Sequence, residues 1–179
     1  MKEFIVAILL VIVTHTGCYM TDNTTPVAGR GTVDINAFDI CKKTIELRGE
    51  WEYYPSAFLS PDELRMTKLS GEKLYAVIPG SWNPGWNLYV PGSGRGFATY
   101  RVLVKTNPSP GCAPAVRIPR IISSYNLFIN GKPAHSSGTP GVSIETTIPR
   151  YDDAIIPLPA GEKRYEFVLQ VANFHAPAG

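Results

Sequence analysis

The sequence has few of the features on which catalysis or nucleic-acid binding depends. Its three histidines, His15, His135 and His175, are isolated, and the local motifs of zinc proteases, dithiol redox centres and serine hydrolases do not occur. The 17 Lys and Arg residues are nearly balanced by 15 Asp and Glu residues, and no basic run could neutralise a row of phosphates. We therefore expect a protein that is not an enzyme, with no metal site, no cofactor and no nucleic-acid partner.

Long apolar runs are also absent. The longest, Phe4 to Val13, has ten residues, whereas a membrane-spanning helix needs ~20. It follows the charged Lys2 and leads to Gly17-Cys18, which is the layout of a secretory signal peptide over residues 1–18. Gly17-Cys18 also resembles the end of a bacterial lipobox, so Cys18 is the candidate lipidation site. We expect a periplasmic or cell-envelope protein, held at the membrane by an N-terminal lipid; the alternative is an uncleaved signal anchor.

Cysteine is scarce, with three residues in the chain. If Cys18 is lipidated, Cys41 and Cys112 remain. An oxidising compartment would allow these two to form a disulfide. No spacing pattern fixes the pair, so two separately buried thiols are the alternative.

The 16 glycines and 16 prolines stand singly or in pairs between short apolar runs, which indicates turns between strands. Residues 19–32 are rich in Thr, Asn and Gly and are predicted to be a flexible tether. Residues 33–179 are predicted to form one domain. Its only expected helix is a short turn that begins at Pro61, with Ser60 as the N-cap.

The rest of the domain shows the period of two that is typical of strands with one buried face. It is clearest at Tyr100 to Lys105 and at Tyr165 to Val171, and Tyr125 to Ile129 runs into the hairpin dipeptide Asn130-Gly131. A bent strand or strand pair is expected around Gly49. The pattern predicts an all-β fold, an antiparallel β-sandwich or jelly roll.

Two segments resemble ligand motifs only superficially. The glycine-rich residues 92–96 lack the Gly-Lys-Ser/Thr ending of a phosphate-binding loop and precede a strand. Asp152 and Asp153 carry the oxygen ligands that Ca²⁺ prefers, but a solvated turn explains them better.

Aromatic and amide residues gather in one predicted loop between Pro79-Gly80 and Pro91-Gly92. Flat aromatic faces beside amides suit the apolar face and hydroxyl rim of a sugar. The alternative is that the tryptophans close one end of the core. Loops at one end of a jelly roll carry recognition, so further polar loop and strand-end residues join the candidate site. The candidate ligand-binding residues are Trp82, Asn83, Trp86, Asn87, Arg95, His135, Asn173 and His175.

Several segments together carry a family resemblance. They are Leu47 to Tyr54, Ile78 to Asn83, Gly96 to Arg101, Tyr125 to Gly131 and Val171 to His175. In this order they resemble the extracellular jelly-roll domain of bacterial seven-transmembrane receptors with diverse intracellular signalling modules. A looser likeness is to the sugar-binding domain of family 2 glycoside hydrolases, which has a galactose-binding-like fold. The resemblance implies a periplasmic sensor for carbohydrate or another small ligand.

Two functions therefore compete. The first is an exported, non-catalytic sensory or ligand-binding module; the second is a structural or protein-interaction β-sandwich lipoprotein with no small-molecule ligand. The chain ends at Gly179 without the seven helices of a receptor, so it is expected to be either freestanding or the front end of a truncated receptor gene. If the domain is cut short, its last strand should form an unpaired edge and favour self-association.

Overall fold

The computed structural model describes residues 25–66, 73–80, 94–121 and 123–176. The candidate lipidation site Cys18 and the loop residues Trp82, Asn83, Trp86 and Asn87 lie outside these ranges. Within them, no helix is long and apolar enough to cross a membrane.

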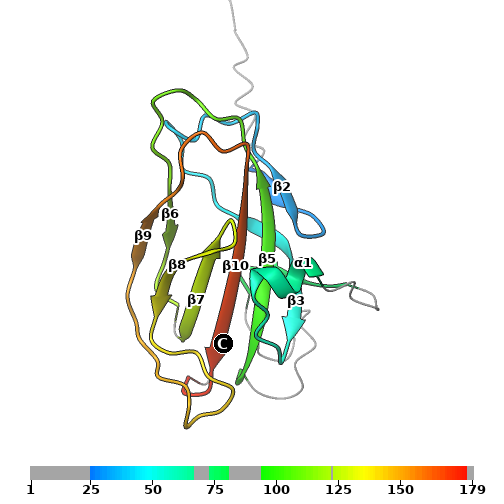
Figure 1. The fold of residues 1–179 in the computed structure, drawn as a ribbon, viewed down its shortest axis with the longest axis vertical. Helices are drawn as coiled ribbons and strands as arrows, with labels where there is room; N and C mark the ends of the chain where they lie inside the picture. The colour runs from blue at the N-terminus through cyan, green and yellow to red at the C-terminus, as the bar shows by residue number, and fades with distance from the viewer. Residues whose placement is uncertain (1–24, 67–72, 81–93, 122, 177–179) are drawn as a thin grey trace, which may run out of the picture.

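The described residues form an eight-stranded sheet, a two-stranded sheet and one short helix (Figure 1). The path of the large sheet is β1-β3-β5-β10-β7-β8, with β2 paired to β5 and β4 paired to β3. The small sheet pairs β6 with β9. The strands are β1 Val27–Ala28, β2 Thr32–Asp34, β3 Arg48–Pro55, β4 Leu74–Ile78, β5 Gly96–Lys105, β6 Ala115–Ile118, β7 Ser124–Ile129, β8 Lys132–Ser137, β9 Ala154–Pro157 and β10 Arg164–Asn173.

The all-β sandwich is confirmed. One face of the large sheet, the inner face, carries Tyr53, Tyr100 and Phe167 into the core, and the small sheet contributes Ile118 and Ile156 to the same cluster. Alternation along the strands therefore separates core side chains from those of the opposite, outer face. Most strand pairs are antiparallel as expected, but β1 runs parallel to β3 and β2 runs parallel to β5.

The helix α1, Pro61–Met66, lies over the outer face of the large sheet (Figure 1). The predicted N-cap is confirmed: Glu63 N donates to Ser60 Oγ over 3.2 Å, and Ser60 N donates to a Glu63 carboxylate oxygen over 2.7 Å. This reciprocal pair is a capping box. The hairpin is confirmed too, with Asn130 and Gly131 at φ 50° and 84° between β7 and β8.

Two expectations are corrected, and two strands were missed. The ordered domain begins before Val33, because Val27–Ala28 pair with β3 and Thr32 pairs with β5; the predicted tether therefore ends too late. Strands β4 and β9 had no sequence prediction. The last strand, β10, is not an edge: it pairs with β5 along its whole length and with β7 over Phe167 to Ala172. The basis for self-association through this strand is therefore removed.

Cys41 and Cys112 form a disulfide, with their Cα atoms 5.7 Å apart. This resolves the alternative left open by the sequence in favour of the bonded pair. The bond joins the segment after β2 to the segment before β6.

Candidate ligand-binding site

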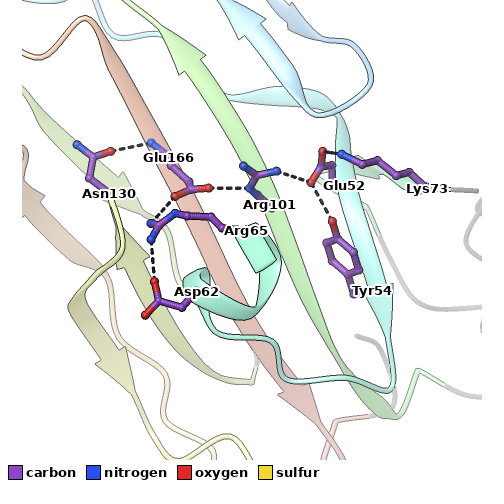
Figure 2. A network of polar contacts seen from close by, with 8 residues as sticks. All are labelled: Glu52, Tyr54, Asp62, Arg65, Lys73, Arg101, Asn130 and Glu166. Carbon is purple, nitrogen blue, oxygen red and sulfur yellow. Dashed lines mark hydrogen bonds and ion pairs between the residues drawn. The ribbon is translucent and has the colours of Figure 1, made fainter. Parts of the chain in front are cut away.

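The outer face of the large sheet carries a row of alternating charges (Figure 2). Arg101 on β5 stands at its centre, directly opposite Glu52 on β3, and donates to it from Nη1 over 2.9 Å. Its Nε donates over 2.7 Å to Glu166 on β10, which lies diagonally across the neighbouring strand pair. Odd- and even-numbered side chains alternate between the faces of a strand, so this spacing sets all three on the outer face.

Side chains from outside the central strands complete the row. Lys73 Nζ lies 2.6 Å from Glu52 Oε1, and Arg65 Nη2 on α1 lies 3.0 Å from Glu166 Oε2. Arg65 also pairs with Asp62 over 2.8 Å. We call this set, Lys73, Glu52, Arg101, Glu166, Arg65 and Asp62, the ion row.

Tyr54 and Asn130 fix two of the acidic residues of the row further, Glu52 and Glu166. The Tyr54 hydroxyl donates to Glu52 over 2.9 Å. Asn130 Oδ1 accepts a hydrogen bond from the backbone N–H of Glu166 over 2.8 Å, which ties the β7–β8 turn to β10. Gly131 leaves room beside it, because a Cβ there would lie 2.5 Å from Arg65 Nη2. The row is thus held by β3, β5, β10, α1, the β7–β8 turn and the residue just before β4.

The electrostatics follow from partial burial. Burial alone would raise the pKa of Glu52, but hydrogen bonds from Lys73 and Arg101 outweigh it and lower that pKa below its ordinary value. Burial would likewise lower the pKa of Arg101, and its hydrogen bonds to Glu52 and Glu166 raise it instead. Burial and the neighbouring Glu52 both raise the pKa of Tyr54. Glu52 and Arg101 therefore stay charged at neutral pH.

A groove of about 850 Å³ lies beside the row on the same face. Its apolar contribution comes from Leu103, two residues along β5 from Arg101, and the rest of its lining is charged or amide side chain. The lining residues are Arg65, Arg101, Leu103, Asn130, Glu162, Lys163, Arg164 and Glu166. Sequence reasoning missed this site, because its members come from separate elements and only the strand register brings them together.

The described residues of the sequence-predicted site lie elsewhere. Arg95 is exposed just before β5, and Asn173 is buried where β10 ends, beside it: Asn173 Nδ2 donates to Gly94 O over 2.6 Å. His175 is exposed and contacts Thr147 O through Nε2 over 2.9 Å. These three therefore share one end of the sandwich, where β10 ends (Figure 1).

Asn173 supports this end structurally, since its amide also bonds to the backbone of Ala176 in both directions. His135 is set apart on β8, half-buried, with Nδ1 3.2 Å from the Tyr125 hydroxyl. The sequence-predicted residues thus divide between the strand end and the inner side of the β7–β8 pair.

The acidic pair Asp152-Asp153 has protein partners. Asp152 accepts a hydrogen bond from Ser137 Oγ and pairs with Arg150, and Asp153 pairs with Arg117 over 2.9 Å. Across the part of the chain that the structure describes, no group of three or more His, Cys, Asp or Glu side chains could hold a metal ion.

No protein-family model matches this sequence, and the comparison with curated proteins gave no match. Among solved structures, the chain is similar to a family 2 β-galacturonidase from Eisenbergiella tayi bound to galacturonate, with 17% identity and a TM-score of 0.46 over 80% of this chain and 22% of that one. A family 2 β-galacturonidase from the same organism bound to glycerol gives 15% identity and a TM-score of 0.43 over 80% of this chain and 22% of that one. A β-glucuronidase from Faecalibacterium prausnitzii gives 14% identity and a TM-score of 0.47 over 72% of this chain and 20% of that one. The chain therefore spans about a fifth of the length of these enzymes.

Proposed function

We propose that this chain is an exported, non-catalytic β-sandwich module that binds a carbohydrate or another hydroxyl-rich small ligand. The observation that carries the proposal is the groove over the outer face, an open depression in which charged and amide side chains gather. Its lining combines guanidinium, carboxylate and amide groups around one aliphatic side chain, Leu103.

This lining suits the chemistry of a sugar. Guanidinium and ammonium groups donate, carboxylates accept, and an amide does both, so hydroxyl groups can be matched in either role. The ion row holds the Arg101 and Glu166 side chains in fixed positions before a ligand arrives, which reduces the entropy lost on binding. Leu103, half-buried between them, offers a surface for the C–H face of a pyranose ring.

The Cys41–Cys112 disulfide supports export. Structural disulfides persist in the periplasm and outside the cell and are rare in the reducing cytoplasm. Together with the signal-peptide pattern over residues 1–18, it supports a location in the periplasm or cell envelope with an N-terminal membrane anchor. The resemblance to receptor jelly-roll domains extends the proposal to a sensory role.

A glycan array followed by titration calorimetry on the positive glycans tests the proposal. Leu103→Ala should weaken binding about fivefold, because it removes the apolar floor of the groove. Val77→Ala on β4 is the matched control, since Val77 is 52% exposed and lies outside the groove. Equal glycan affinity in wild type and Leu103→Ala would show that glycans bind outside the groove. If no glycan binds at all, the proposed carbohydrate-binding function is rejected.

Protein interaction is the second candidate function, and a separate observation favours it. Five large apolar side chains are exposed within one stretch of 14 residues: Val142, Ile144, Ile148, Tyr151 and Ile155. Contiguous exposed apolar surface marks interaction sites, and these residues are close together in sequence. Replacing Ile148 and Ile155 with serine should then abolish the binding of a protein partner while leaving glycan affinity unchanged.

A further inference from the structure

We propose that the groove binds the negatively charged group of an acidic saccharide, and that Lys163 and Arg164 recognise that group. This inference rests on the proposed function, because it names the class of carbohydrate that the same groove takes. The groove carries charges that the ion row does not neutralise.

The ion row is balanced within itself. It contains three cations and three carboxylates, and each carboxylate lies within 3.0 Å of a cation of the row (Figure 2). Arg101 and Glu166 are also poorly accessible, with side chains 16% and 10% exposed. The row can donate and accept hydrogen bonds at the edge of the groove, but it leaves no surplus charge for a ligand.

Lys163 and Arg164 supply that surplus. Both line the groove, both are exposed, and neither takes part in any ion pair among the described residues. Arg164 precedes Glu166 by two positions on β10, so strand alternation sets it on the same outer face. The remaining carboxylate of the lining, Glu162, is exposed in the preceding turn and offsets one of the two positive charges.

The chemistry of the two cations fits a planar or tetrahedral oxyanion. A guanidinium offers two parallel N–H donors to a carboxylate or sulfate, and an adjacent ammonium adds a point charge. A neutral sugar could engage both groups only through its hydroxyl groups, whereas a uronate or sulfate ester on the ring would also offer them an opposite charge. We therefore expect acidic saccharides to bind more tightly than neutral ones of the same length.

Titration calorimetry with three tetrasaccharides tests this: fully N-acetylated chitotetraose, which is neutral, hyaluronan tetrasaccharide, which carries carboxylates, and chondroitin sulfate tetrasaccharide, which adds sulfates. Wild type should bind the acidic probes at least tenfold more tightly than chitotetraose. The double variant Lys163→Gln/Arg164→Gln should lose that preference, since hydrogen bonds to charged groups are each worth about tenfold or more in affinity. The ratio between the two acidic probes distinguishes a carboxylate from a sulfate ester as the recognised group.

The matched control is Arg117→Gln/Arg120→Gln, which removes the same net charge from exposed residues at and just after β6, outside the groove. It should keep the preference, and an equal loss in both double variants would overturn the site in favour of a general charge effect. Equal binding of neutral and acidic probes by wild type would overturn the inference and leave the proposed function standing. No binding of any saccharide would reject both, and thermal melts that match wild type establish that the variants are folded.

Discussion

Arg101 lies directly opposite Glu52 in the register between β5 and β3, and its Nη1 is 2.9 Å from Glu52 Oε2. The two residues occupy the outer face of a sheet whose inner face is apolar, and they have 16% and 7% of their side chains exposed. A charge pair this little hydrated stabilises the fold best while both members are present, because removing one leaves the other poorly hydrated with one ionic partner fewer.

Stability should therefore fall in acid through Glu52. Its pKa is lower in the folded protein than its ordinary value, so the unfolded chain binds the proton first as pH falls. The stabilising contribution of ionised Glu52 is fully present above the unfolded-state pKa of about 4.3. It is lost as pH falls through the lower folded-state pKa. Urea unfolding measured from pH 7 to pH 2.5 should show this decline.

Glu52→Gln isolates the effect. At pH 7 it should cost about 3 kcal/mol of unfolding free energy, because Arg101 and Lys73 lose a charged partner. Its stability should also fall less than that of wild type between pH 5 and pH 2.5. Glu46→Gln, at an exposed position, is the control and should follow the wild-type curve. If Glu52→Gln loses as much unfolding free energy as wild type between pH 5 and pH 2.5, other carboxylates cause the decline.

The disulfide should contribute more to stability than any single contact of the ion row. Cys41 and Cys112 are 71 positions apart, and a closed loop of this length restricts the unfolded chain by about 4 kcal/mol. Cys41→Ser/Cys112→Ser should lose about that much unfolding free energy, and adding reductant to the wild type should reproduce the loss. A wild-type protein whose denaturation midpoint does not respond to reductant would contradict the prediction.

Alanine substitutions at two glycines distinguish the cost of backbone strain from the cost of a steric clash. Gly138 and Gly161 have φ values of 64° and 78°, which disfavour any other residue. A Cβ at Gly161 meets open space, whereas one at Gly138 would lie 2.1 Å from Ile148 O. Gly161→Ala should cost about 1–2 kcal/mol from the backbone alone, and Gly138→Ala clearly more. Equal melting temperatures for the two variants would mean that the loop at Ile148 moves away without cost.

Local signals account for the parts of the fold that the sequence predicted. Alternation at Tyr100 to Lys105, the Asn130-Gly131 turn and the Ser60 N-cap each act within a few residues, and each is confirmed. Strand order has no such signal. The position of β10 between β5 and β7 depends on pairings with residues more than 30 positions away, which is why it was wrongly expected at an edge.

The difference between local and long-range signals also explains why the sequence predicted the loop site and missed the groove. The sequence shows aromatic residues close together at Trp82 to Tyr89, whereas the groove takes its lining from α1, β5, the β7–β8 turn, the turn before β10 and β10 itself. Glu52, Arg101 and Glu166 carry no motif and become neighbours only through the strand register. Glu52 and Glu166 are buried although they lie on the polar side of their strands. The sequence pattern predicts exposed side chains there, and only the strand pairing shows that Arg101 lies between them.

The loop tryptophan predicted from the sequence can be tested against a tryptophan of the core. Trp51 on β3 is 8% exposed within the core cluster, and its Nε1 has no hydrogen-bond partner in the described structure, so its contribution is packing. Trp51→Ala should cost about 3–5 kcal/mol, as truncations of buried aromatic residues do. If Trp86 stacks on a ligand as the sequence predicts, Trp86→Ala should melt close to wild type and lose glycan binding. Differential scanning calorimetry and the tetrasaccharide titrations on both variants give the comparison. A Trp86→Ala protein that melts as low as Trp51→Ala while still binding glycan would assign Trp86 to the core and leave recognition to the groove on the outer face.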